Sequence, residues 1–246
     1  MPRSARIKAE SGFYHVIQKA TGGQNLFEDT LDFRTYLEYL KSKSEANGVG
    51  VIAYCLMSNH IHLLVQDSDG HLSEMMHALA MSYAQHFNRR GGHIGHVFQQ
   101  RFKSQPIEDN GYLLQAVRYI HNNPAKAGIC SAPDYYWSSY REYVGKPEIA
   151  DTAGVLELCG GVDGFKAFSA QYERDERFFE KPDRLSDAAA MVVAEEILGP
   201  LPISELKAAD KGRRNTLLFQ LRRAGISVRQ LSRMTGIGKN IIERAR

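Results

Sequence analysis

His60 and His62 have the residue type and the spacing of metal ligands. They open the apolar run of residues 61–65, which predicts a β-strand. Side chains alternate between the two faces of a strand, so both imidazoles point the same way, with Cβ atoms roughly 7 Å apart. Two imidazoles held side by side on a rigid element are half of a metal site. The other half must come from elsewhere in the chain.

Tyr119 and Asn123 form a second pair of polar side chains, on a predicted helix. They are four residues apart, so they stack as neighbours on one helix face. On a helical wheel this face lies roughly 150–180° from the apolar stripe, together with Tyr112. The wheel by itself favours a structural interpretation, in which a tyrosine lies at the core margin and an asparagine ends the helix before Pro124. The apolar stripe expected to face the sheet consists of Leu113, Leu114, Val117 and Ile120.

The elements around these residues predict how they are held. Apolar runs and helical periodicities alternate along the first half of the chain in the order β-α-β-β-α-β-α. This order suits an α+β fold, a ferredoxin-like antiparallel sheet with helices mainly on one face. The predicted strands cover residues 13–17, 51–57, 61–65 and 103–107, and the predicted helices cover residues 30–44, 72–88 and 110–123.

Composition limits the class of protein. Of the 246 residues, 43% are hydrophobic and 24% are charged, as in globular proteins. No run approaches the ~18 apolar residues of a membrane span, and the N-terminus lacks the apolar segment of a secretory signal. Three scattered cysteines argue against a disulfide framework or a zinc ribbon and favour a reducing compartment. We therefore expect a cytoplasmic protein with no membrane partner.

Charge is distributed unevenly along the chain, whose formal net charge is +3. Residues 145–200 contain 6 basic and 12 acidic side chains, whereas residues 201–246 contain 11 basic and 3 acidic ones. The basic tail favours an anionic partner, with nucleic acid the leading candidate, although a basic helical face in solvent would give the same count. The predicted domains are residues 1–145 around the sheet, residues 146–200 as an acidic helical connector, and residues 201–246 as a basic helical unit.

The basic unit has the pattern of a helix-turn-helix. Ser227 is suited to cap the first helix, and Gly236 supplies the turn before the second. Such a unit would dock on duplex DNA, and a basic bundle that binds another protein is the alternative. Its expected core is Leu218, Leu221, Val228, Leu231, Ile237 and Ile241, and its expected DNA contacts are Arg229, Lys239, Asn240 and Arg244.

Three stretches of the chain, residues 54–65, 102–104 and 118–128, resemble the single-tyrosine transposases of the HUH endonuclease superfamily. The resemblance is strongest to REP-associated tyrosine transposases and their insertion-sequence relatives, and it covers roughly residues 5–145. It implies a ferredoxin-like fold and a divalent metal cofactor, Mg²⁺ or Mn²⁺. It also implies a transposase that cleaves and rejoins single-stranded or hairpin DNA through a 5′-phosphotyrosine intermediate.

The same resemblance assigns roles to individual residues. His60 and His62 would be metal ligands, and Tyr119 would be the nucleophile. Asn123 stands where relatives often have Gln as a third ligand, and it offers the same carbonyl oxygen on a shorter arm. Ser58 stands where relatives usually have Pro. The basic side chains near these motifs are candidate phosphate contacts, accompanied by aromatic rings: Arg101, Lys103, Arg118 and Lys126, with Phe98, Phe102 and Tyr112.

Two other functions fit parts of the same pattern. One is a non-catalytic DNA-binding regulator built on the same fold. The other is a zinc hydrolase that uses His60 and His62, but no third histidine or carboxylate has a persuasive spacing for it. The lead prediction is a metal-dependent single-stranded DNA endonuclease and strand transferase, acting as a monomer or a homodimer.

Overall fold

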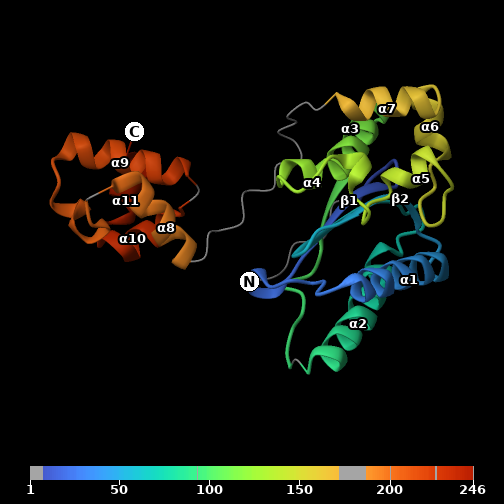
Figure 1. Cartoon of the computed structure of the whole chain (residues 1–246), viewed down its shortest axis with the longest axis horizontal. Coiled ribbons are helices and arrows are strands. Elements are labelled where there is room, and N and C mark those ends of the chain that lie inside the picture. The colour runs from blue at the N-terminus through green and yellow to red at the C-terminus, as the bar shows by residue number, and fades with distance from the viewer. Residues whose placement is uncertain (1–7, 93, 172–186, 200, 225, 246) are drawn as a thin grey trace. The chain divides into compact units, whose positions relative to one another are not determined.

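Two compact units make up the chain, Met1–Phe178 and Phe179–Arg246, each with an apolar core of its own. None of the described helices is long and apolar enough to cross a bilayer. The acidic stretch around residues 173–187 falls almost entirely outside the described residues. The computed structural model describes residues 8–92, 94–171, 187–199, 201–224 and 226–245 (Figure 1).

A four-stranded antiparallel sheet forms the centre of the first unit. Its order is β2-β3-β1-β4, so β1 and β3 lie in the middle. This arrangement confirms the predicted α+β class, and the succession of strands and helices is that of a ferredoxin-like sheet. The strands are β1 (Phe13–Lys19), β2 (Gly50–Leu56), β3 (His60–Gln66) and β4 (Lys103–Ile107).

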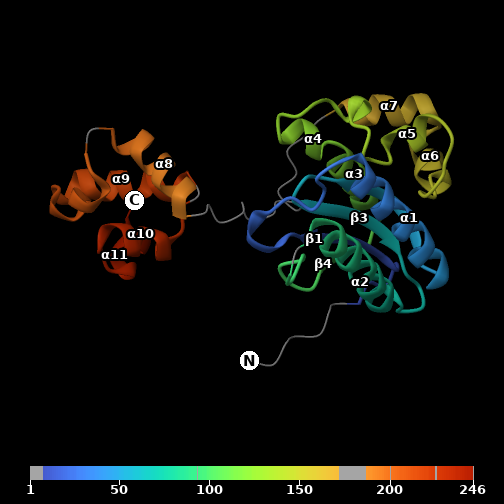
Figure 2. The same ribbon diagram turned by 60° about the horizontal axis from the view of Figure 1, so that its bottom comes forward.

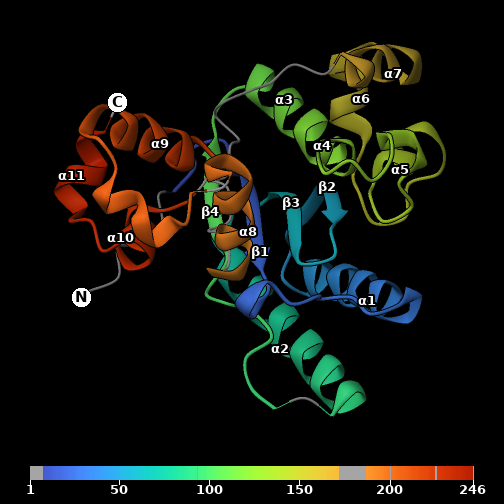
Figure 3. The same ribbon diagram turned by 60° about the vertical axis from the view of Figure 1, so that its left-hand side comes forward.

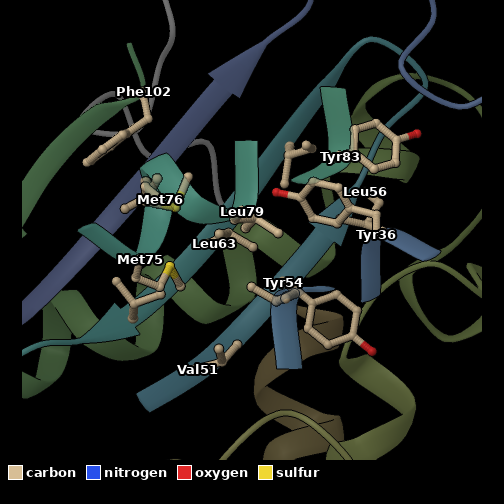
Figure 4. Packing of buried hydrophobic residues seen from close by; sticks show 14 of the residues in the cluster. Tyr36, Val51, Tyr54, Leu56, Leu63, Met75, Met76, Leu79, Tyr83 and Phe102 are labelled. Atoms are coloured by element: carbon tan, nitrogen blue, oxygen red, sulfur yellow. The ribbon is translucent and has the colours of Figure 1, made fainter. Parts of the chain in front are cut away.

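Two helices, α1 (Thr30–Ala46) and α2 (Leu72–Gly91), cover one face of the sheet (Figures 1 and 3). Large apolar side chains from both helices and from the strands pack between them (Figure 4). Met75 and Met76 are fully buried in this core, so the methionine-rich stripe of α2 is structural. Other members of this core drawn in Figure 4 are Tyr36, Tyr54, Leu63, Leu79 and Tyr83.

The opposite face of the sheet carries α3 (Asn110–His121) and the helices that follow it (Figure 1). The reason lies in β2, which is apolar on both sides: Tyr54 and Leu56 face one core, and Ala53 and Cys55 face the other. A strand buried on both sides needs a helical layer on each face. The helices therefore divide between the two faces, whereas the sequence predicted them mainly on one. The later helices of this layer are α4 (Asn123–Lys126), α5 (Tyr140–Val144), α6 (Ala153–Cys159) and α7 (Val162–Ala170).

The first unit extends beyond its predicted limit at residue 145. Helices α6 and α7 pack into the same core as α3, through Val155 and Phe165. Helix α8 (Asp187–Leu198) instead contributes buried alanines to the core of the second unit. The predicted connector, residues 146–200, is thus divided between the two units, because its apolar positions are buried although its overall charge is acidic.

The second unit is a small helical bundle. Ser227 caps α10, since its side chain accepts a hydrogen bond from the backbone N–H of Gln230, and Gly236 ends that helix in a left-handed conformation with φ 66°. Both features are as predicted. Ile242 occupies the core in place of Ile241, which is 46% exposed. Figure 2 shows α11 next to α10. The elements of this unit are α8, η4 (Ile203–Ala208), α9 (Lys211–Arg223), α10 (Val228–Thr235) and α11 (Lys239–Arg244).

Candidate active site

The two predicted ligand histidines lie side by side on β3. Strand side chains alternate, so His60 and His62 share a face with Leu64, which packs in the core beneath α3. The ring centroids of the two histidines are 4.9 Å apart. His62 is 1% exposed, whereas His60 is half-buried. The pair therefore stands at the margin of the covered part of the sheet, with one ring inside and one ring partly in solvent.

Helix α3 brings Tyr119 against this pair. The ring of Tyr119 is half-buried, and its centroid lies 5.7 Å from that of His62 in an edge-to-face contact. Leu113, Val117 and Ile120 of the predicted apolar stripe pack toward the sheet, but Leu114 is only half-buried, and Tyr112, expected on the opposite face, is buried in the same core. The helix is therefore rotated relative to the wheel prediction, and this rotation turns Tyr119 toward the sheet. The structure thus brings the tyrosine and the histidine pair together, although they are far apart in the sequence.

The side chain of Asn59 fixes the orientation of the His60 ring. The distance from Nδ1 of His60 to Oδ1 of Asn59 is 2.7 Å. An amide oxygen accepts hydrogen bonds and never donates them, so Nδ1 of His60 carries a proton, and the neutral form of the ring has its lone pair on Nε2. An imidazole in this form is able to bind a metal ion through Nε2.

His62 has a buried ring nitrogen, Nε2, with no hydrogen-bond partner among the described residues. Burial holds the pKa of His62 well below its usual 6.5, and the neighbouring imidazoles and the charges of Lys19 and Lys126 act in the same direction. The ring is therefore neutral near pH 7. A neutral imidazole with an unpaired nitrogen fits a metal ion, and this atom is the clearest structural indication of one.

Asn123 begins α4 beside Tyr119. Its Nδ2 donates to the backbone carbonyl oxygen of Tyr119 at 2.9 Å, so the two residues are stacked as the wheel predicts. This bond uses the amide nitrogen and leaves Oδ1 for another partner. No group of three His, Cys, Asp or Glu side chains suited to a metal occurs in the described part of the chain. A metal held here would rely on two imidazoles and a neutral oxygen, such as Oδ1 of Asn123.

His15 belongs to the same cluster of rings, although nothing in the sequence pattern singled it out. It lies on β1 and is 1% exposed, and burial lowers its pKa to about 4. Its ring lies nearly parallel to that of His62, with the two centroids 5.3 Å apart, and its centroid is 5.8 Å from that of the Tyr119 ring. The strand register reveals the contact, because Ile17 lies opposite His62 and His15 is two residues away on the same face.

The predicted phosphate contacts of the first unit differ in their exposure. Arg101, Lys103 and Lys126 are exposed, and Nζ of Lys126 lies 5.1 Å from the ring centroid of Tyr119. Arg118 is only 7% exposed, and its guanidinium packs 4.5 Å from the ring centroid of Phe168 in α7. This burial contradicts the prediction for Arg118, whose side chain lies on the flank of α3 that α7 covers.

The aromatic rings expected to accompany these charges are mostly inside the unit. Phe102 is 8% exposed and belongs to the core beneath α2, and Tyr112 is 9% exposed and belongs to the core beneath α3. Phe98 is half-buried against the first of these cores. The predicted surface therefore retains three of its four basic side chains and has no fully exposed ring among these three aromatics.

The predicted DNA contacts of the second unit all lie on its surface. Arg229 is exposed on α10, and Lys239, Asn240 and Arg244 are exposed on α11. Arg222 of α9 donates from Nη1 to three backbone carbonyl oxygens at the end of α11, at 3.2, 2.9 and 3.5 Å. Because this contact fixes the end of α11, the polar side chains of that helix are presented on an ordered element.

One solved structure of similar fold is a REP-associated tyrosine transposase bound to a REP hairpin. It has a TM-score of 0.50 and 16% sequence identity, and the match covers 62% of this chain and 96% of that one. At this identity the likeness shows the fold. A candidate transposase from Deinococcus radiodurans R1 has a TM-score of 0.36 and 18% identity, over 49% of this chain and 97% of that one. No curated protein matches the chain.

A family model described as an IS200-like transposase matches residues 9–123. The matched region contains the whole four-stranded sheet, the histidine pair and the helix that carries Tyr119. Asn123 is its last residue. Over this region, slightly less than half of its length, the chain is therefore similar to the IS200-like transposases.

Proposed function

We propose that the first unit is a metal-dependent endonuclease and strand transferase for single-stranded DNA, with Tyr119 as its nucleophile. The main support is the contact between the ring of Tyr119 and that of His62, whose Nε2 is buried with no partner in the described chain. A nucleophile and an unpaired ligand nitrogen then lie close enough to act on one phosphate. His60, His62 and Tyr119 come from one unit of one chain, which favours a site complete in the monomer over one shared in a homodimer.

In the proposed reaction the phenol oxygen of Tyr119 attacks the phosphorus of a phosphodiester. The new bond joins the tyrosine to the 5′-phosphate, and the bond between phosphorus and the 3′ oxygen breaks. The phenol proton passes to solvent, and the leaving oxygen takes up a proton to give a free 3′ hydroxyl. Attack by a 3′ hydroxyl on the phosphotyrosine restores a phosphodiester, so one site both cleaves and joins strands.

The residues proposed to hold the metal are His60, His62 and Asn123. When bound, the ion, Mg²⁺ or Mn²⁺, supplies positive charge to a phosphate oxygen. Imidazole ligands suit Mn²⁺ better than Mg²⁺, which prefers oxygen. Lys126, with Nζ 5.1 Å from the ring centroid of Tyr119, adds a second positive charge that favours both the ionised phenol and the bound phosphate. The edge contact of Tyr119 with His62 limits the rotation of the nucleophile's ring.

Single-stranded or hairpin DNA is the proposed substrate. The solved transposase of similar fold is bound to a REP hairpin, and for this chain the support comes from exposed basic side chains beside the site. Lys103 of β4 lies opposite Ile17 of β1, which lies opposite His62 of β3. Lys103 is therefore on the same sheet face as His62, two strands and about 10 Å away. A strand of DNA that crosses β1 would place successive phosphates near both.

The second unit is proposed to bind duplex DNA through Arg229, Lys239, Asn240 and Arg244. Their exposure on two short helices joined by a turn supports docking of α11 in a groove. A contact with another protein is the alternative for the same surface. Loss of duplex affinity in a variant with these side chains replaced by Ala would favour DNA, and unchanged affinity would favour the alternative.

A covalent-adduct assay tests the proposed reaction. Wild-type protein is incubated with hairpin-bearing single-stranded DNA and Mg²⁺ or Mn²⁺, and a denaturing gel then reports protein-linked DNA. We expect an adduct with wild type and none with Tyr119→Phe. The matched control is Tyr136→Phe, which removes the hydroxyl of a 51% exposed tyrosine of the same unit and is expected to leave the adduct unchanged. An adduct that persists in Tyr119→Phe, or none with wild type, favours a non-catalytic DNA-binding regulator.

A further inference from the structure

His15 is a buried histidine that the proposed reaction leaves without a role. Its Nε2 lies 3.1 Å from Nδ1 of His62, a hydrogen-bond distance. The two rings are nearly parallel, with an angle of 16° between their planes. The contact therefore joins β1 to a proposed metal ligand on β3 through a single buried hydrogen bond.

One proton occupies this contact, and its position decides what His62 is able to bind. If Nε2 of His15 carries the proton, Nδ1 of His62 accepts it, and a neutral His62 must carry its own proton on Nε2. That nitrogen is buried and meets no acceptor within the described chain. If Nδ1 of His62 carries the proton, Nε2 of His62 keeps a lone pair, which is what a metal ion requires.

We propose that His15 is a positioning residue, which accepts the Nδ1 proton of His62 and so reserves Nε2 of His62 for the metal. The inference rests on the proposed metal-dependent function and adds the group that orients one ligand. Asn59 makes the corresponding contact with His60 through Oδ1. Each proposed imidazole ligand thus has its own hydrogen-bond acceptor, and acceptors of this kind fix the ring of a ligand and increase its affinity for the metal.

The position of His15 is suited to orienting His62 and not to binding the metal as a third ligand. The two nitrogens of an imidazole point in divergent directions, so a group bonded to Nδ1 of His62 lies on the other side of the ring from a metal at Nε2. Nε2 of His15 is the atom engaged with His62. The two nearly parallel rings meet edge to edge at these nitrogens, so loss of His15 frees both the proton position and the ring angle.

The position of the proton is measured first, in the full-length protein without metal. Histidines are labelled with ¹⁵N, and long-range ¹H–¹⁵N correlation spectra report which ring nitrogen carries hydrogen. The His62 signals are identified by their loss in His62→Gln. We expect hydrogen on Nδ1 of His62 in wild type. Hydrogen on Nε2 of His62 overturns the proposal without any variant of His15.

Metal affinity is measured next, with Mn²⁺ as the probe and free Mn²⁺ followed by electron paramagnetic resonance. His15→Leu has similar bulk and no acceptor, and we expect its affinity to fall about 10- to 100-fold. His15→Gln supplies an amide oxygen as acceptor, and we expect its affinity to stay within about threefold of wild type, because an acceptor is restored. His121→Leu is the control, since it removes another fully buried histidine of the same unit, one bonded to Ser139.

The outcomes distinguish this inference from the function on which it rests. Absence of Mn²⁺ binding by wild type refutes the proposed metal site and the role of His15 with it. Equal Mn²⁺ affinity in wild type and a folded His15→Leu refutes the role of His15 alone. An equal loss in His15→Leu and His121→Leu assigns the effect to general destabilisation and also refutes it. Thermal unfolding of each variant establishes that the protein compared is folded.

Discussion

Acidification is expected to destabilise the first unit through its buried histidines. Burial lowers the pKa of His15 to about 4 and that of His121 to about 3, from 6.5. The folded state keeps both rings neutral, whereas the unfolded chain binds protons as the pH falls below 6.5. The stabilising contribution is therefore complete above pH 6.5 and is lost as the pH falls toward the folded-state values.

The magnitude follows from the size of these shifts. A pH of about 5 lies about 1.5 units below the unfolded-state pKa of 6.5. At this pH, protonation of each histidine stabilises the unfolded chain by about 2 kcal/mol. His15 and His121 together lower the free energy of unfolding by about 4 kcal/mol, and the lowered pKa of His62 adds to the loss. This is a large part of the roughly 5–15 kcal/mol that stabilises a typical domain, so the loss of stability at about pH 5 is large enough to measure.

Urea unfolding followed by circular dichroism at about pH 7.5 and about pH 5 measures the difference. A chelator in both buffers removes any contribution from metal release. The matched variant is His121→Gln, which cannot titrate and is expected to lose about 2 kcal/mol of the pH-dependent difference. Equal free energies of unfolding at the two pH values would show that the buried histidines do not make stability depend on pH, and an unchanged pH dependence in His121→Gln would exclude His121 as a source of it.

Three further predictions concern the proposed functions. His62→Ala is expected to weaken Mn²⁺ binding at least about tenfold, measured by titration, because it removes the buried unpaired nitrogen; unchanged affinity would place the metal elsewhere. Lys126→Ala is expected to slow adduct formation. It is also expected to reduce the slope of log affinity against log salt for single-stranded DNA by about one, and an unaltered slope would count against a phosphate contact. Replacement of Arg229, Lys239 and Arg244 by Ala is expected to reduce the slope of log affinity against log salt for duplex DNA by about three. Adduct formation on single strands is expected to continue. Binding assays at several salt concentrations measure the slope, and an unchanged slope would count against duplex binding by these side chains.

The parts of the site that short sequence periodicities determine were predictable. Alternation along a strand places His60 beside His62, and a spacing of four residues on a helix places Asn123 beside Tyr119. The apolar stripe of α3 predicts that Leu113, Val117 and Ile120 pack on the sheet, but not that Tyr119 turns toward it, because Tyr112 and Ala116 share the buried face. Each of these relations involves residues close together in the chain, so the periodicity of the element is sufficient.

The parts that depend on pairing between distant segments were not predictable. His15 reaches His62 only because β1 pairs with β3 in a particular register. Arg118 is covered by Phe168, from a helix whose composition indicated an acidic connector. The choice between Ile241 and Ile242 as a core residue depends on the rotation of α11, which is too short for its own periodicity to determine. Neither the net charge of a segment nor its local residue pattern determines which helix and strand surfaces pack together.

We propose that Tyr119 attacks a DNA phosphate and becomes linked to its 5′ end. The most direct measurement is mass spectrometry of peptides from protein that has reacted with hairpin-bearing single-stranded DNA in the presence of Mn²⁺. We expect one modified peptide, with a nucleotide joined through its 5′-phosphate to Tyr119. Linkage to another residue, linkage through a 3′-phosphate, or cleavage with no covalent peptide would contradict it.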